Sequence, residues 1–219
     1  ADATDGLTFA DLAASQVVAD FGRAGEDPVP TGGSAVVAKI GAGASFADMA
    51  WKAVNIGDEG GFAPPLNTVA EALEMISRAA SDAGYGPGKD VFLAMDAASS
   101  EFFVDGKYEV DGFSLTAGEL ADHYVGLSKE FPIISIEDPF FEDDFDSTAE
   151  LTRKIGKDVQ IVGDDIFVTN TERLRRGISV GAANALLLKV NQIGTVTESG
   201  QAAETSFANG GQLAVSHSE

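Results

Sequence analysis

Hydrophobic and polar positions along the chain follow two alternating patterns from about Ala53 onward. Short apolar runs rich in Val, Ile and Leu are separated by longer stretches in which apolar residues recur every three or four positions. The first pattern predicts buried strands and the second predicts amphipathic helices, so their alternation indicates βα units on a parallel sheet or barrel. The predicted strands are 53–58, 91–96, 132–137, 159–164, 185–190 and 213–217.

The predicted helices carry start signals. A Ser or Thr followed three residues later by Glu is typical of a helix N-terminus, and this pattern occurs at Thr68–Glu71, Thr116–Glu119, Ser147–Glu150 and Thr169–Glu172. Apolar spacing predicts helices over about 68–83 and 117–129. Asp105-Gly106, between two short β-rich segments, predicts a small hairpin.

The first 52 residues have a different pattern. Leu12, Val17, Val18 and Phe21 have helical spacing and predict one helix. Residues 22–43 are crowded with Gly and Pro, which is typical of turns and linkers.

Composition narrows the class of protein. The 219 residues are 44% hydrophobic and include no Cys, so the chain can bury a core without disulfides, and this fits a reducing compartment. Asp and Glu number 35 against 14 Lys and Arg, which gives a net charge of −21. That charge repels phosphate backbones and anionic membranes, so we expect no nucleic-acid partner. No apolar run approaches the roughly 18 residues of a membrane span, and the first residues show no basic segment followed by an apolar one, so we expect neither a membrane span nor a secretion signal.

Candidate chemistry lies at the strand ends. In a βα barrel these ends open on one face, where active sites are built. Several clustered carboxylates repel one another and need a counter-charge, which a divalent cation supplies. The residues at or just after the predicted strands are Asp58, Glu59, Asp96, Glu137, Asp138, Asp164, Asp165, Lys189 and His217.

Asp96, Glu137 and Asp164 are the predicted ligands of this cation. Hard oxygen donors without Cys or clustered His select Mg²⁺. Lys189 follows on the next strand, where it either neutralises the carboxylates as a structural ion pair or acts as a base. The residues alone leave both roles open. Metal-assisted proton abstraction beside a carboxylate is the chemistry that such a site supports.

Six motifs resemble enolase, the phosphopyruvate hydratase of glycolysis, and occur in that family's order from about residue 44 to 219. They are GDEGGFAPP (57–65), DAASSEFF (96–103), PIISIEDPF (132–140), VGDDIFVTN (162–170), LLKVNQIGTVTE (187–198) and SHSE (216–219). The resemblance implies an α/β fold, a TIM-like βα barrel of the enolase type preceded by a small N-terminal domain. We expect residues 1–35 to be a remnant of that domain and its linker, and 36–219 to form a barrel that is incomplete in this chain. Six strand candidates stand where eight are needed, which suggests that the chain belongs to a longer enolase.

The resemblance also implies an activity, the reversible Mg²⁺-dependent dehydration of 2-phosphoglycerate to phosphoenolpyruvate. The three predicted carboxylate ligands match the family's Mg²⁺ ligands. Lys189 matches the base that removes the C2 proton, and Glu59 matches the acid that helps the C3 hydroxyl leave. His217 and Ser218 match substrate-contacting positions.

Two alternatives remain open. The family's SHRSGE motif lacks its arginine here, which favours a catalytically impaired enolase-like protein that acts by binding, for example by binding plasminogen at a cell surface. Another member of the superfamily that acts on a different carboxylate is disfavoured by Glu59 and by KVNQIG (189–194). By resemblance we expect a homo-oligomer, a dimer or an octamer, in the cytoplasm, with the cell surface or secretion as a second location.

Overall fold

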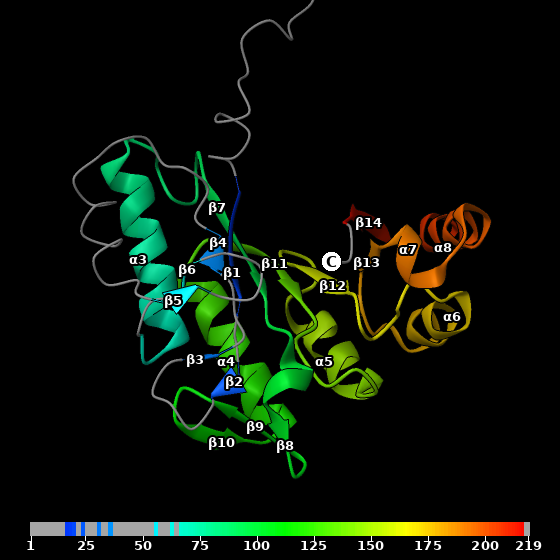
Figure 1. Ribbon diagram of the computed structural model, residues 1–219, viewed down its shortest axis with the longest axis horizontal. Helices are drawn as coiled ribbons and strands as arrows, with labels where there is room; N and C mark the ends of the chain where they lie inside the picture. Colours follow the sequence, from blue (N-terminus) through cyan, green and yellow to red (C-terminus); the bar gives the residue numbers. More distant parts are fainter. Residues whose placement is uncertain are drawn as a thin grey trace, which may run out of the picture.

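The structure is a computed structural model built around a largely parallel sheet (Figure 1). It describes residues 66–216 and, before them, the backbone of six short strands. The helices are α3 (Val69–Asp82), α4 (Ala117–Glu130), α5 (Phe145–Ile155), α6 (Thr171–Val180), α7 (Val190–Ile193) and α8 (Val196–Ala208), with a 3₁₀ helix η1 (Ser99–Phe102). The strands are β1 (Gln16–Asp20), β2 (Arg23–Ala24), β3 (Pro30–Thr31), β4 (Ala35–Val36), β5 (Asn55–Ile56), β6 (Phe62–Ala63), β7 (Phe92–Asp96), β8 (Phe103–Val104), β9 (Lys107–Val110), β10 (Phe113–Leu115), β11 (Ile133–Glu137), β12 (Gln160–Gly163), β13 (Ala185–Leu188) and β14 (Gln212–Val215).

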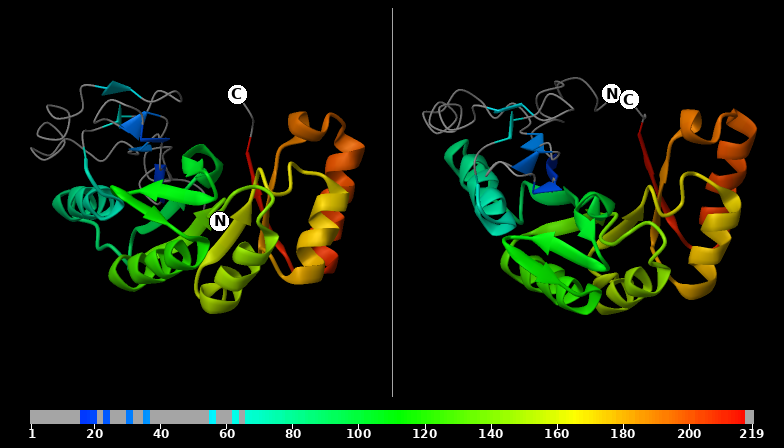
Figure 2. Two further views of the ribbon diagram at one scale, coloured as in Figure 1. Left: turned by 90° about the horizontal axis from the view of Figure 1, so that it is seen from below. Right: turned by 60° about the horizontal axis from the view of Figure 1, so that its bottom comes forward.

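The main sheet has the strand order β14-β13-β12-β11-β7-β1-β4-β6-β5. From β14 to β1 all neighbours are parallel, and β4, β6 and β5 continue the sheet with antiparallel pairs. Figure 2 shows the parallel strands curving, with α4, α5, α6 and α8 along their convex side. This succession of βα units confirms the predicted barrel-type α/β fold. Among the strands that the structure describes, β14 and β5 stand at the two ends of the order.

Five of the six predicted strands coincide with β7, β11, β12, β13 and β14. Within the predicted strand 53–58, the structure describes β5, which pairs antiparallel with β6 outside the parallel part of the sheet. The helix predicted around Val17 and Val18 is wrong, because these residues lie in β1, parallel to β7. Consecutive β-branched residues suit a strand once a neighbouring strand is available to pair with them. Leu12 and Phe21 lie outside the described residues.

The two long predicted helices are confirmed. Thr68 caps α3 by accepting a hydrogen bond from the backbone N–H of Glu71. Thr116 and Glu119 form a complete capping box at α4, in which each side chain accepts a hydrogen bond from the other residue's backbone N–H. These hydrogen bonds satisfy N–H groups that the first helical turn leaves without partners.

The other two predicted caps are wrong. Helix α5 begins two residues before Ser147, and Asp144 caps it by accepting from the Ser147 N–H at 3.0 Å. Helix α6 is capped by Asn170, whose side chain accepts from two backbone N–H groups of the first turn. Thr169 therefore does not cap α6. The sequence pattern misplaces both caps because Asp and Asn are equally good caps at neighbouring positions.

The predicted hairpin is confirmed. Strands β8 and β9 pair antiparallel around Asp105 and Gly106, both of which have positive φ, as a two-residue turn of this kind requires. The hairpin is anchored to the loop after β11, because the Tyr108 hydroxyl accepts a hydrogen bond from the Phe141 N–H at 3.0 Å. Phe141 also stacks on Phe103, with ring centroids 4.8 Å apart.

Two apolar clusters hold the helices to the sheet. The larger contains Leu73 of α3, Leu120 of α4 and Leu151 of α5, packed with Leu93 and Ile136 of the central strands, and all five are at most 1% exposed. Burying one such side chain contributes about 1.5–3 kcal/mol. The smaller cluster packs α6 and α8 against the later strands and includes Phe145, Ile166, Phe167, Leu174, Leu186 and Ala202.

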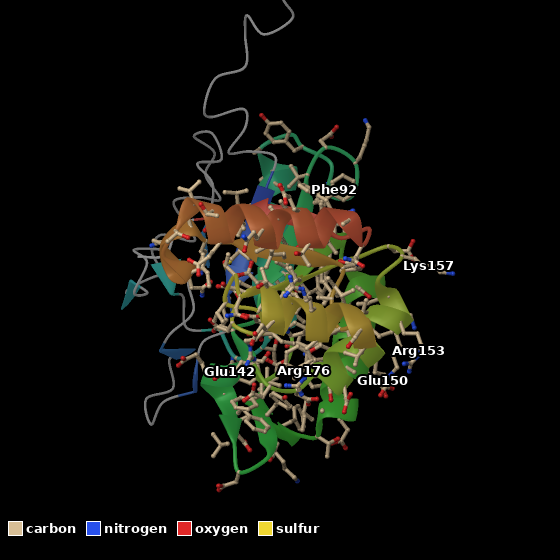
Figure 3. All side chains as sticks on the ribbon, turned by 90° about the vertical axis from the view of Figure 1, so that its right-hand side faces the viewer. Phe92, Glu142, Glu150, Arg153, Lys157 and Arg176 are labelled. Atoms are coloured by element: carbon tan, nitrogen blue, oxygen red, sulfur yellow. The ribbon has the colours of Figure 1, made fainter. Side chains whose placement is uncertain are left out.

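The outer face of α5 is polar. Arg153, and Lys157 just after the helix, are exposed and project away from the ribbon (Figure 3). Glu150 lies on the same helix, 3.3 Å from Lys154 Nζ.

In the part of the chain that the structure describes, no helix is long and apolar enough to cross a membrane.

The corrected cap of α5 can be tested by comparing two substitutions. Asp144→Ala removes the acceptor of the Ser147 N–H and should lower the free energy of unfolding by about 1 kcal/mol. Ser147→Ala leaves that hydrogen bond in place and should change it by less than about 0.5 kcal/mol. Denaturant titration of the intact protein measures both values. A larger loss for Ser147→Ala would contradict the corrected cap.

Candidate active site

Four neighbouring parallel strands each deliver an ionisable side chain at the same edge of the sheet. Asp96 ends β7 and is paired in register with Glu137, which ends β11. Asp164 directly follows β12, and Lys189 directly follows β13. Because carboxyl ends of parallel strands meet at one edge, these four side chains share one region, as the sequence predicts.

Lys189 and Asp164 form an ion pair at the centre of this region. Their Nζ and Oδ2 atoms lie 2.5 Å apart, and the side chains are 17% and 10% exposed. Burial alone lowers the pKa of Lys189, but the hydrogen bond to Asp164 and the charges of Asp164, Glu137 and Asp165 outweigh it and raise that pKa. A lysine in this pairing is held protonated.

Glu137 lies beside this pair, and among the described residues Lys189 is the positive charge that acts on it. Burial raises its pKa well above the usual range, and the charges of Asp96, Asp138 and Asp164 raise it further, while Lys189 acts to lower it. Within the part of the chain that the structure describes, carboxylates therefore gather around Lys189. The ionised form of Glu137 would be favoured by any additional cation bound there.

Asp138 serves as a backbone clamp. Its carboxylate accepts hydrogen bonds from the N–H groups of Asp164, at 3.0 Å, and of Asp165, at 2.7 Å. It is almost fully buried, and burial raises its pKa to about 7 although those two hydrogen bonds act to lower it. The clamp ties the end of β11 to the turn after β12 and so fixes where Asp164 stands. The sequence places Asp138 at a strand end but does not reveal that its partners are backbone amides.

The acidic trio with the closest oxygens differs from the predicted one. Within the described residues, carboxylate oxygens of Asp138, Asp164 and Asp165 lie within 4.8 Å of one another, so this trio could also hold a metal ion. It shares only Asp164 with the predicted ligand set. Both oxygens of Asp138 already accept backbone N–H groups, and Asp165 is exposed, which makes this trio the weaker candidate.

The turns that follow the strands are strained. Non-glycine residues with φ between 39° and 54° follow β7, β11 and β12, where Ala98, Asp138, Val168 and Thr169 lie. The left-handed region is costly for residues with a Cβ and most costly for β-branched ones, so strain of this kind persists only where the surroundings enforce it. Four such residues lie at the edge that also carries the ionisable side chains.

The loops at this edge are also cross-linked. Ser100 Oγ donates to Glu142 Oε2 at 2.9 Å, which connects the segment after β7 to the segment after β11. Arg173 of α6 donates to the backbone carbonyl of Glu142 at 2.6 Å and to Asp143 at 3.0 Å. Figure 3 labels Glu142 and Arg176. The guanidinium of Arg176 lies 4.0 Å from the centre of the Phe145 ring. These contacts tie the segments after β7 and β11 to each other and to α6.

Comparison with known proteins identifies the family. Residues 33–219 match the family model described as the enolase C-terminal TIM barrel domain. The chain belongs to the enolase family. A protein named enolase from Methanocaldococcus jannaschii is 57% identical to it over 165 residues, which cover 75% of this chain and 38% of that protein. Those from Thermococcus gammatolerans and Thermococcus kodakarensis are 54% and 55% identical over 167 residues, covering 75% of this chain and 39% of each relative.

These matches confirm the resemblance seen in the motifs. The enolase-family chain spans less than two fifths of the length of the relatives it matches. Of the predicted site residues, Asp96, Glu137, Asp164 and Lys189 lie at one edge of its sheet. Glu59, His217 and Ser218 lie outside the described residues, so their roles stay predictions.

The clamp formed by Asp138 can be tested by stability. Asp138→Ala removes the acceptor of one buried and one part-buried N–H group and should lower the free energy of unfolding by about 2 kcal/mol. Asp138→Asn keeps one acceptor oxygen and tolerates positive φ, so its loss should be smaller. The control is Asp165→Ala, which removes an exposed carboxylate of the same turn and should change stability by less than about 0.5 kcal/mol. Equal losses for Asp138→Ala and Asp165→Ala would contradict the clamp.

Proposed function

We propose that the protein to which this chain belongs catalyses the Mg²⁺-dependent, reversible dehydration of 2-phosphoglycerate to phosphoenolpyruvate. The observation that carries the proposal is the lysine held among strand-end carboxylates, with Lys189 Nζ 2.5 Å from Asp164 and its charge acting on Glu137. The names of the relatives support the same activity. The binding-only alternative gains no support from the described residues.

Lys189 is the proposed base. The C2 proton of 2-phosphoglycerate is very weakly acidic, because its loss leaves a carbanion beside a carboxylate that is already charged. In the proposed reaction, that proton passes to the neutral Nζ of Lys189, and the electron pair left on C2 forms the new C2–C3 double bond as the C3–O bond breaks. The hydroxyl leaves as water with a proton supplied by Glu59, the predicted acid. A positioned base of this kind contributes about 10²- to 10⁴-fold to the rate.

The pairing with Asp164 sets the protonation of Lys189. Because the neighbouring carboxylates raise its pKa, the amine is protonated while Asp164 is fully available to it. Any positive charge that competes for Asp164 weakens this pairing and makes Lys189 a better base. We therefore infer that Lys189 passes between two states, the ion pair with Asp164 and the neutral base.

Asp96, Glu137 and Asp164 are the proposed ligands of Mg²⁺. They supply hard oxygen donors from three adjacent strands, and the raised pKa of Glu137 indicates a site that favours added positive charge. When bound, the ion supplies charge that stabilises the doubly negative carboxylate of the deprotonated substrate.

His217 and Ser218 remain proposed substrate contacts. Assembly as a dimer or octamer, a cytoplasmic location and the division at residue 35 also stay predictions.

The role of Lys189 is tested by turnover. In the intact protein, Lys189→Ala should lower kcat for 2-phosphoglycerate by about 10²- to 10⁴-fold, because the proton acceptor is lost. Lys154→Ala is the matched control: its amine pairs with Asp122 and Glu150 on the outer helices, and its loss should leave kcat unchanged. Formation of phosphoenolpyruvate, followed by its absorbance, measures both. Full activity in Lys189→Ala, or no turnover in the unmodified protein, would contradict the proposal.

The ligand set is tested by metal affinity. Chelation with EDTA should abolish turnover, and added Mg²⁺ should restore it. Asp96→Asn removes a charged donor and should weaken Mg²⁺ binding by at least about tenfold, measured by titration calorimetry. Asp165→Asn removes a member of the alternative trio and should weaken it by less than about threefold. The opposite order would move the ion to Asp138, Asp164 and Asp165.

A further inference from the structure

Thr169 is buried in a conformation that its side chain disfavours. It is 0% exposed and has φ 54°, directly after Val168 with φ 44°. Two consecutive β-branched residues in the left-handed region are unusual, since their side chains crowd the backbone there. Helix α6 does not require this, because Asn170 provides its cap. The strain therefore needs another explanation.

The hydroxyl of Thr169 lies at the meeting point of two loops of the site. It accepts a hydrogen bond from the backbone N–H of Lys189 at 3.0 Å. Its single proton has two acceptors within reach, Gln192 Oε1 at 3.2 Å and the Leu187 carbonyl at 3.4 Å. A threonine pushed into the left-handed region thus reaches across from the turn after β12 to the turn after β13.

A ring of interactions closes through these contacts. Gln192 directs its side-chain Nε2 toward Asp164 Oδ1, 3.5 Å away, while its oxygen faces Thr169. Asp164 Oδ2 accepts from Lys189 Nζ, and the Lys189 backbone N–H returns to Thr169. The ring holds Lys189 at both ends, at the backbone through Thr169 and at the amine through Asp164. Gln192 therefore contacts both the Thr169 hydroxyl and the Asp164 carboxylate.

We propose that Thr169 is a positioning residue, which through its hydroxyl sets the place of Lys189 and, through Gln192, the orientation of Asp164. The inference rests on the proposed function, because it assigns Thr169 to the same proton transfer. Lys189 stands where β13 turns into α7, and within the described residues no side chain caps that short helix. Among the described contacts, the Thr169 hydroxyl is the group that ties the Lys189 backbone to the turn after β12. Loss of such a supporting contact displaces the base and lowers the rate of the chemical step more than it weakens substrate binding.

The experiment compares three variants of the intact protein. Thr169→Val keeps the shape and removes the hydroxyl, Thr169→Ser keeps the hydroxyl, and Thr152→Val is the control. Thr152 donates a comparable hydrogen bond, 2.8 Å from the Ala182 carbonyl, on α5. Two readouts are used: hydrogen–deuterium exchange of the Lys189 backbone amide, and kcat and KM for 2-phosphoglycerate.

Thr169→Val should speed exchange at Lys189 and lower kcat by about 10- to 100-fold with KM changed less than about threefold. Thr169→Ser should stay within about threefold of the unmodified protein in both readouts, and Thr152→Val should leave both unchanged. If Thr169→Val does not fold, Gln192→Leu decides, because it opens the same ring from the other side. A tenfold loss of kcat in Gln192→Leu supports the proposal.

Three results would overturn the proposal: unchanged exchange and kcat in Thr169→Val, an equal loss in Thr169→Ser, or an unchanged Gln192→Leu where Thr169→Val fails to fold. Failure of the proposed function gives a different result. If the unmodified protein does not turn over 2-phosphoglycerate, the assigned reaction is wrong, while exchange at Lys189 still shows whether Thr169 holds that residue.

Discussion

Repulsion among carboxylates at one edge of the sheet is the constraint on which the rest of the site depends. Parallel pairing from β7 to β13 brings Asp96, Glu137 and Asp164 to that edge, and only Lys189 opposes them within the described residues. Burial raises the pKa of Glu137, and the neighbouring carboxylates raise it further. Added positive charge stabilises such a cluster of carboxylates. A reaction that removes a proton from an anionic substrate also requires positive charge nearby.

The scaffold holds these groups in place through backbone contacts. The carboxylate of Asp138 fixes the turn that carries Asp164, and the hydroxyl of Thr169 fixes the turn that carries Lys189. Both residues have positive φ, so the fold accepts local strain to make these contacts. The buried apolar clusters beneath the sheet supply the stability that such strain requires.

The sequence predicts the parts of this molecule that depend on local pattern. Runs of apolar residues locate β7, β11, β12, β13 and β14, and helical spacing locates α3 and α4, because burial imposes these periods. The strand at Val17 and Val18 is missed because it depends on pairing with β7, which is distant in sequence. Motifs place the ionisable residues at strand ends. The clamps escape prediction because the partners of Asp138 and Thr169 are backbone amides that any sequence contains.

The measurement that tests the account most directly is the location of the divalent ion. Crystals of the intact protein grown with Mn²⁺ in place of Mg²⁺ would reveal the ion by its anomalous scattering. We predict one peak with oxygens of Asp96, Glu137 and Asp164 at about 2.0–2.3 Å, the range for small divalent cations, and with Lys189 beside it. A peak held by Asp138, Asp164 and Asp165, or no peak at this edge of the sheet, would contradict the account.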